Sequence, residues 1–325
     1  MPTSAMSTTT TATEQLQALR APTGPYVDLE AMIQLRFCAQ DLDLSARKLS
    51  QSLQAGQTRT RFRGRGMEFE EVRHYQAGDD IRSIDWRVTA RTQVPHTKLY
   101  REERERPVLV VTDQRPAMFF GSQTCFKSVT ACYCAALIAW AALKNNDRIG
   151  GLIFNDVNEQ DLRPKRSRHS LLALLRGLHE FNQGLQSPLA EKAAQPLSQR
   201  LSDLRRIAKP GSALFIISDF HDLDEDCREQ LYQLSRHCEI TLLPIHDPLE
   251  ATLPTNKLLT VSDGVQRKQI DSSNSQARYQ AHFQQQQKNL KHLSGQLGLG
   301  LLPVSTTDNP ITLLQQQLGA RACRR

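Results

Sequence analysis

Short apolar runs alternate with stretches of helical periodicity through most of the chain beyond residue 107. The apolar runs lie at residues 108–113, 149–154, 213–220 and 239–245. Helical spacing of apolar residues follows at 125–144, 169–182, 197–208 and 224–237. Apolar strands that alternate with helices are typical of a parallel sheet buried on both faces. The pattern therefore predicts an α/β fold with a doubly wound, mostly parallel sheet.

Smaller elements follow Pro254. Residues 257–271 predict a short hairpin between turn residues. The Gln-rich stretch keeps helical spacing, so we expect a helix near 275–295 with one solvated face. A strand from Leu299 and an amphipathic helix near 311–318 complete the predicted domain.

One apolar run has to be weighed as a membrane span. Residues 129–143 are uncharged and lie between Lys127 and Lys144. As a helix, this run would be about 22 Å long, whereas the hydrocarbon core of a bilayer is about 30 Å thick. We therefore expect a helix buried inside the protein.

The N-terminal third divides differently. Residues 1–28 are rich in Ser, Thr and Ala and lack the basic start and apolar core of an export signal, so they predict a disordered tail. Apolar positions across 29–54 predict a helix or helix pair. The expected domains are the tail at 1–28, an N-terminal helical and charged β-rich elaboration at 29–106, and the α/β domain at 107–320.

Residues 64–107, the charged segment, hold closely spaced arginines and carboxylates around one tryptophan. Eleven Lys or Arg face nine Asp or Glu between Arg61 and Arg106. Arginine pairs bidentately with carboxylates, so the mixture predicts an ion-paired scaffold or a protein-facing surface. We expect Arg73, Arg82, Arg91 and Arg104 to pair with nearby acids. Trp86 is expected to be mostly buried, as the anchor that ties this segment to the α/β domain, and the alternative is an exposed binding residue.

Composition narrows the class of partner. The net charge is +7 among 325 residues, but the basic residues are interspersed with acids, which argues against a nucleic-acid-binding role. The seven cysteines form no CxxC pair and predict a reducing compartment, here the cytoplasm.

Candidate chemistry lies first at the strand ends. Asp113 and Asp219 end two predicted strands, where doubly wound sheets bind their ligands. A strand-end carboxylate followed by hydroxyl residues would suit Mg²⁺, but the residues after Asp113 are not hydroxyl residues. His221 could act as a base, although no activated nucleophile accompanies it.

The charged segment offers weaker candidates. Asp79 and Asp80 could be a catalytic carboxylate pair, but an Asp-rich turn bonded to arginines is the favoured interpretation. His74 and His96 are far apart in sequence, lack metal-ligand spacing and are expected to be structural.

The charged segment and the first strand resemble a bacterial family, the "domain of unknown function fifty-eight" family. The resemblance covers roughly residues 60–320, and the later part of that family is similar to a von Willebrand factor A domain. Its structural motif residues here are Gly64, Gly66, Glu68, Arg73, Gly78, Asp79, Asp80, Arg82, Asp85, Trp86, Arg91, Glu103 and Arg104.

The resemblance implies a function. Members of the family often neighbour MoxR-type AAA+ ATPases, which implies a non-enzymatic adaptor in protein or complex assembly and maturation. It also leaves room for contacts with other von Willebrand A proteins and for a peripheral membrane complex. No cofactor is expected. We expect partner contacts on an exposed face that includes Arg115, Met118, Phe119 and His221.

The resemblance also bears on the metal site. An intact von Willebrand A domain carries Asp-x-Ser-x-Ser, whereas this chain has Asp113, Arg115 and Ala117 at those positions. A degenerate site without metal is implied, in which Arg115 replaces the ion and pairs with Asp113 and Asp219. In the alternative, Arg115 points to solvent and Asp219 caps the next helix.

Two other functions remain open from the sequence. A metal-dependent hydrolase or nuclease could use the carboxylates of Glu70, Asp79, Asp80 and Asp85 if they converge. A nucleic-acid-binding protein would instead use the excess basic charge and bind with steep salt dependence.

Overall fold

The computed structural model describes residues 21–44, 67–76, 79–102, 106–185, 195–254, 258–262 and 267–319. The chain divides into two compact units. The first, the sheet unit, comprises residues 1–50 and 106–325, and the second, the hairpin unit, comprises residues 51–105.

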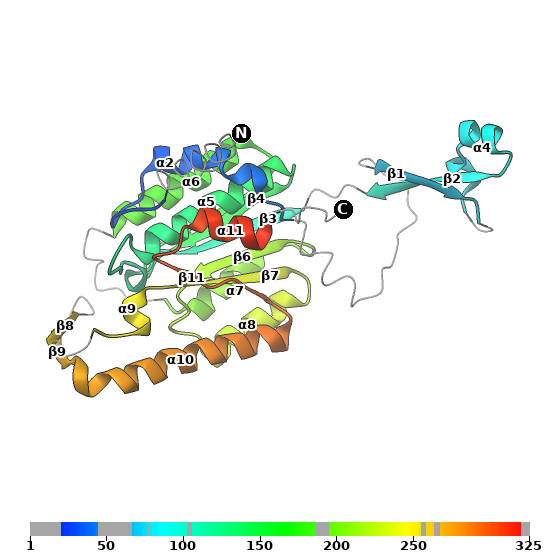
Figure 1. The fold of residues 1–325 in the computed structure, drawn as a ribbon. Helices are drawn as coiled ribbons and strands as arrows, with labels where there is room; N and C mark the ends of the chain where they lie inside the picture. The colour runs from blue at the N-terminus through cyan, green and yellow to red at the C-terminus, as the bar shows by residue number, and fades with distance from the viewer. Residues whose placement is uncertain are drawn as a thin grey trace, which may run out of the picture. The chain divides into compact units, whose positions relative to one another are not determined.

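A mostly parallel sheet forms the centre of the sheet unit, in the strand order β10-β7-β6-β3-β4-β5, with β11 also paired to β7 (Figure 1). All pairs are parallel except β4 with β5. The strands are β3 (Pro107–Asp113), β4 (Arg148–Phe154), β5 (Glu159–Lys165), β6 (Ala213–Ser218), β7 (Glu239–His246), β10 (Gly300–Leu301) and β11 (Val304–Ser305).

Helices cover both faces of this sheet (Figure 1). Successive residues of a strand point to opposite faces, so Val108 and Val110 join one core cluster and Leu109 and Val111 the other. The first cluster includes α2 (Leu29–Gln34), α5 (Lys127–Lys144), α6 (Arg168–Gly184) and α11 (Pro310–Leu318). The second includes α7 (Leu197–Ile207), α8 (Glu225–Ser235) and α10 (Ser272–Leu297). The doubly wound α/β fold is thus confirmed.

Helix α5 is the apolar run weighed above. Its residues from Lys127 to Ala142 are all buried, because the sheet lies on one side and α2, α6 and α11 on others. The prediction of a helix inside the protein is confirmed. Within the described residues, no helix combines the length and apolar character needed to cross a membrane.

The N-terminal helix belongs to the sheet unit. Helix α2 and the 3-10 turns η1 (Leu35–Phe37) and η2 (Ala39–Asp41) pack on α5, and the Trp140 indole donates to the Met32 carbonyl at 3.0 Å. The sequence had grouped this helix with the charged segment. Its apolar side instead finds a partner in α5. Residues 21–28, expected in the tail, also pack here, with Val27 buried.

The hairpin unit is built on two antiparallel strands, β1 (Met67–His74) and β2 (His96–Glu102), as the sequence predicted. Between them lie the 3-10 turn η3 (Ile81–Ser83) and the helix α4 (Trp86–Thr92). The sequence did not predict α4. Asp85 begins this helix by accepting hydrogen bonds from the backbone N–H groups of Arg87 and Val88.

The C-terminal elements follow the prediction with one change. The short helix α9 (Pro248–Ala251) precedes the hairpin of β8 (Leu258–Ser262) and β9 (Arg267–Asp271), and the Gln-rich helix is α10. The strand expected from Leu299 is two short pieces, β10 and β11, which both pair with β7.

Candidate functional site

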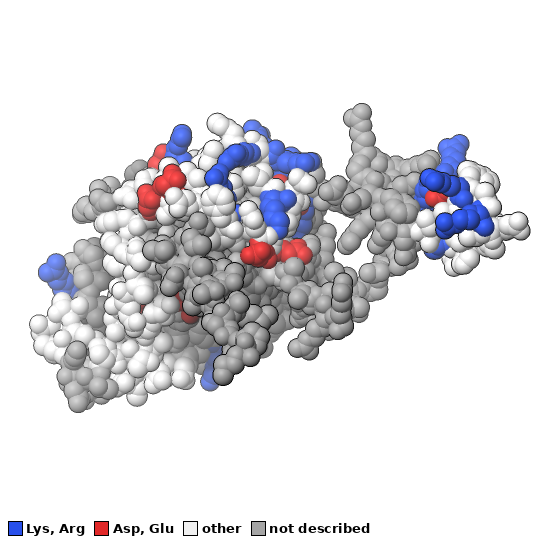
Figure 2. Space-filling view, turned by 45° about the horizontal axis from the view of Figure 1, so that its top comes forward, with Lys and Arg blue, Asp and Glu red and all other residues white. Residues whose placement is uncertain are grey.

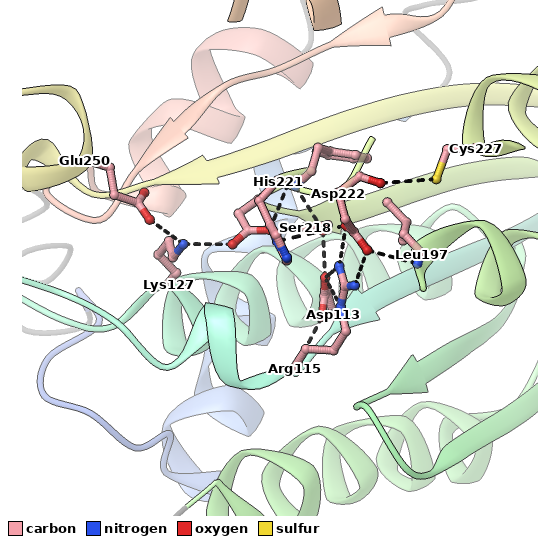
Figure 3. A network of polar contacts seen from close by, with 11 residues as sticks. Asp113, Arg115, Lys127, Leu197, Ser218, His221, Asp222, Cys227 and Glu250 are labelled. Atoms are coloured by element: carbon pink, nitrogen blue, oxygen red, sulfur yellow. Dashed lines mark hydrogen bonds and ion pairs between the residues drawn. The ribbon is translucent and has the colours of Figure 1, made fainter. Parts of the chain in front are cut away.

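Three neighbouring strands end in acids at the carboxyl edge of the sheet. Asp113 is the last residue of β3, Asp219 directly follows β6, and Asp247 directly follows β7. Asp247 caps α9 and accepts hydrogen bonds from Ser122 and Thr306, so its role is structural. Asp113 belongs to the polar network drawn in Figure 3, and Asp219 pairs with Lys127 of the same network.

Arg115 lies between two carboxylates in this network (Figure 3). Its Nε and Nη2 donate to Asp113 at 3.1 and 2.8 Å, and its Nη1 and Nη2 donate to Asp222 at 2.5 and 3.0 Å. Ser218 Oγ also donates to Asp113, at 2.7 Å. Arg115 is only 4% exposed. The predicted pair with Asp113 is confirmed, whereas the predicted pair with Asp219 is wrong, because Asp222 takes that place.

A second buried cation neutralises Asp219. Lys127 Nζ lies 2.8 Å from Asp219 Oδ2 and 2.6 Å from Glu250 Oε1, and the Lys127 side chain is 2% exposed. His221 Nδ1 lies 2.8 Å from the other oxygen of Asp219. Asp219 therefore does not cap the next helix, whose N-cap is Asp224. In the sequence, Lys127 stands out only as the flank of an apolar run. Its buried ion pair could have been inferred from its position, because it is a charged residue in the first turn of a helix that is apolar on every side.

The backbone at Phe220 separates the two ion pairs. Phe220 has a φ of 53°, in the left-handed region, and its side chain is buried. Asp219 precedes this turn and pairs with Lys127, while Asp222 follows it and pairs with Arg115. Two acids three residues apart thus serve two different cations.

Contacts within the network favour the charged forms of Arg115, Asp219 and His221. Burial alone would lower the pKa of Arg115, but hydrogen bonding to Asp222 and the charge of Asp113 raise it. Burial alone would raise the pKa of Asp219, but the hydrogen bond with His221 and the charge of Lys127 hold it well below its usual range. The hydrogen bond with Asp219 raises the pKa of His221.

The residues present do not fit a divalent cation. A hard ion needs carboxylate, hydroxyl and water oxygens with open lone pairs. Here the Arg115 guanidinium lies against both oxygens of Asp113, Lys127 binds Asp219, and Ala117 has no side-chain donor. Among the described residues, no cluster of three or more His, Cys, Asp or Glu side chains is arranged to hold a metal.

The expected partner-binding residues are only partly at the surface. Arg115 and Met118 are buried, so the expectation that they are exposed is wrong. Phe119 is half-buried because its ring packs against Tyr26 and Phe126. His221 is exposed, as expected. In the loop after β3, the exposed residues near Arg115 are instead Pro116, Ala117 and Phe120.

The acids of the hairpin unit act separately. Asp79 pairs with Arg73 at 2.8 Å, as expected for the turn. Asp80 caps η3. Asp85 caps α4 and lies 3.5 Å from Lys98. These three carboxylates therefore serve local structure and do not form the convergent set that metal-dependent hydrolysis requires.

Other predictions for this unit have mixed outcomes. Trp86 is 66% exposed, so the hairpin unit itself does not bury it, and its expected role as an anchor to the α/β domain stays a prediction. Arg82 and Arg91 are exposed as well. His74 and His96, separated in sequence, stack with ring centroids 4.5 Å apart because the hairpin register pairs them. Gly64, Gly66, Gly78, Glu103 and Arg104 lie outside the described residues, as do the side chains of Glu68 and Glu70.

Similar proteins include uncharacterized proteins of Mycobacterium. Rv1480 of Mycobacterium tuberculosis and Mb1516 of Mycobacterium bovis are each 30% identical to this chain over 194 residues. The match covers 59% of the chain and 58% of each relative, so the chain spans well under two thirds of their length.

Two solved structures resemble this one. The conserved hypothetical protein BatB from Bacteroides thetaiotaomicron matches with a TM-score of 0.37 and 14% identity, covering 65% of this chain and 96% of its own. The SpRpn10 VWA domain matches with a TM-score of 0.40 and 12% identity, covering 67% of this chain and all of its own.

The family model described as "Protein of unknown function DUF58" matches residues 71–292, which is more than half of the chain. The matched range includes described motif residues of the hairpin unit. It also includes the ion pairs of Arg115 and Lys127 at the strand ends. This chain therefore belongs to the DUF58 family, as its charged segment and first strand predicted.

Proposed function

We propose that this protein is a non-enzymatic adaptor that works with a MoxR-type AAA+ ATPase in the assembly or maturation of a protein complex in the cytoplasm. One observation carries the proposal. Two of the three strand-end acids, Asp113 and Asp219, are neutralised by buried cations of the chain itself, Arg115 and Lys127, and the third, Asp247, caps a helix. Such a site is suited to presenting a fixed surface.

The rival functions have less support. A hydrolase or nuclease would need convergent acids, and Asp79, Asp80 and Asp85 are engaged separately in a pair and two caps. A nucleic-acid-binding protein would need a run of cations at the face where ligands meet the sheet. That face instead carries exposed acids at the start of α8, Asp224, Glu225 and Asp226.

The contact with the ATPase lies on the carboxyl-end loops of the sheet. In folds of this kind these loops carry function, because the sheet beneath them is rigid. Phe120 is 36% exposed, and His221 is exposed in another of these loops. An aromatic group among exposed acids is suited to a partner surface that is basic with an apolar pocket.

The test is binding of the full chain to the MoxR-type ATPase of the same organism, measured by biolayer interferometry with ATP, with ADP and without nucleotide. Wild type should bind, and Phe120→Ala should weaken binding about tenfold, as expected for an interface anchor. His221→Ala should weaken it less, because its imidazole is half-exposed and already hydrogen-bonded to Asp219.

Matched controls lie on other surfaces of the sheet unit. Leu172 in α6 and Tyr232 in α8 are exposed to a degree similar to Phe120, and their replacement by alanine should leave binding unchanged. If wild type does not bind in any nucleotide state, the adaptor proposal fails. If it binds and Phe120→Ala binds equally well, only the face is wrong.

A further inference from the structure

The outer face of α4 in the hairpin unit is an apolar stripe bordered by arginines. Residues three and four apart are neighbours on a helix surface. Trp86 therefore lies next to Ala90, and Arg87 next to Arg91, and all four side chains are exposed. Trp86 is 66% exposed, whereas the other tryptophan, Trp140, is 7% exposed. Large exposed aromatic groups beside arginine are the residue types most enriched at binding hot spots.

More apolar surface is exposed in the same unit. Ile81 in η3 is 64% exposed and Val94, just after α4, is 45% exposed. Monomeric proteins seldom leave several large apolar side chains of one small unit in water without a partner.

The opposite side of α4 is fixed to the hairpin. Thr89 Oγ1 accepts a hydrogen bond from His96 N at 3.0 Å, and Asp85 N donates to the His96 carbonyl at 2.8 Å. Thr92 Oγ1 lies 3.1 Å from His96 Nδ1. Strand β2 therefore holds the helix in one orientation. A rigid platform loses little conformational entropy when its exposed side chains bind.

The arginines of this face are open to a partner. Asp79 is engaged by Arg73, and Asp85 caps α4. Among the described residues, neither the Arg87 nor the Arg91 guanidinium has a carboxylate within 4 Å. On the visible face of the hairpin unit, basic side chains outnumber acidic ones (Figure 2). The excess charge of the face is positive.

We infer that the outer face of α4, formed by Trp86, Arg87, Ala90 and Arg91, binds an acidic protein segment that carries a large apolar side chain. The apolar side chain would cover Trp86 and Ala90, and its acidic neighbours would pair with the two guanidinium groups. Nucleic acid fits less well, because its binding rests on many contacts between cations and phosphates, and this helix face offers two arginines. The inference is independent of the ATPase contact proposed for the sheet unit.

The experiment starts from a random twelve-residue peptide library displayed on phage and selected on the full chain. The enriched peptides are then synthesised with fluorescein and titrated by fluorescence anisotropy. We expect them to combine Asp or Glu with Phe, Leu or Trp. Trp86→Ala should weaken their binding at least tenfold, and Arg87→Glu should do the same and reduce its salt dependence.

Matched variants separate the face from general charge and apolarity. Arg176→Glu makes the same charge change on the exposed side of α6. Leu172→Ala removes an exposed apolar side chain from that helix. Both should bind as wild type. Circular dichroism and hydrogen exchange of β1 and β2 verify the fold of each variant, and Arg87→Glu tests the face even if Trp86→Ala disturbs it.

Other outcomes would overturn the inference. If the enriched peptides lack acidic residues, the face does not bind an acidic segment. The same conclusion follows if both α4 variants bind the peptides as strongly as wild type. A fluorescein-labelled single-stranded DNA of twenty nucleotides that binds wild type but not Arg87→Glu would assign the face to nucleic acid. Self-association in sedimentation velocity that is lost in Trp86→Ala would assign it to a second copy of the chain.

Discussion

Lys127 and Asp219 form an ion pair of 2.8 Å in which the two side chains are only 2% and 7% exposed. The lysine begins the most deeply buried of the described helices, and the aspartate follows a central strand. The pair therefore fixes the first turn of α5 to the end of β6. Arg115 and Lys127 thus neutralise Asp113 and Asp219 at the carboxyl edge of the sheet.

Removing Lys127 should be costly. Lys127→Met leaves the buried carboxylate of Asp219 with His221 alone, and breaking a buried pair costs about 3–5 kcal/mol. Urea unfolding measures the loss. Adding Asp219→Asn to the same chain should cost much less than it does in wild type, because the uncompensated charge is already present.

Lys144→Met is the control for this substitution. It makes the same change at the opposite end of the same helix, where the side chain is less buried, and it should cost under about 1 kcal/mol. Equal losses at the two positions, or strictly additive losses in the double variant, would mean that the pair with Asp219 contributes nothing specific.

His221 should make stability depend on pH. Its pKa is raised in the folded state by the hydrogen bond with Asp219, whereas an unfolded histidine titrates near pH 6.5. The stabilisation is therefore fully present below about pH 6.5 and is lost as pH rises through the folded pKa. The difference in unfolding free energy between wild type and His221→Gln should shrink across this range. A difference that stays constant from pH 5.5 to 9 would contradict the assignment.

Magnesium should not stabilise wild type, because Arg115 and Ala117 stand where an oxygen site needs hydroxyl ligands. Replacing them together, as Arg115→Ser with Ala117→Ser, should destabilise the protein by leaving Asp113 without its guanidinium. Adding 5 mM MgCl₂ should then raise the Tm of the variant and not of wild type, since a ligand stabilises the state that binds it. A magnesium-dependent Tm in wild type would refute the displacement of the ion by Arg115.

The hairpin unit should respond unequally to its charged residues. Asp79→Asn weakens the pair with Arg73 and should cost about 1–3 kcal/mol, because the carboxylate is 6% exposed. Arg91→Ala removes an exposed side chain and should cost under about 0.5 kcal/mol. Hydrogen exchange of the β1 and β2 amides reports both changes. Faster exchange in Arg91→Ala than in Asp79→Asn would reverse this ranking.

Much of the sheet could be predicted from the chain because burial on both faces leaves a continuous apolar signal. Strands β3, β4, β6 and β7 and the helices between them follow that signal. Strand β5 was missed. It lies at the sheet edge, its residues alternate between half-buried and exposed, and its sequence EQDLRPK carries no apolar run. Helix α4 was missed because its start depends on one capping aspartate, Asp85.

In the candidate site, too, contacts between residues close in sequence could be predicted, and contacts between distant segments could not. The sequence by itself determined that Asp113 and Arg115 lie two residues apart at a strand end, where either a pair or a solvent-facing Arg115 was expected, and the structure shows the pair. Only the tertiary structure decided that Asp222 completes this pair and that Lys127 takes Asp219. The left-handed backbone at Phe220 sends the two acids to different cations, and the packing of α5 brings Lys127 to the strand edge. Trp86 likewise is at the surface because α4 turns its Thr89 side toward β2. Pairings of this kind depend on the paths of segments far apart in sequence, which no local pattern of residues contains.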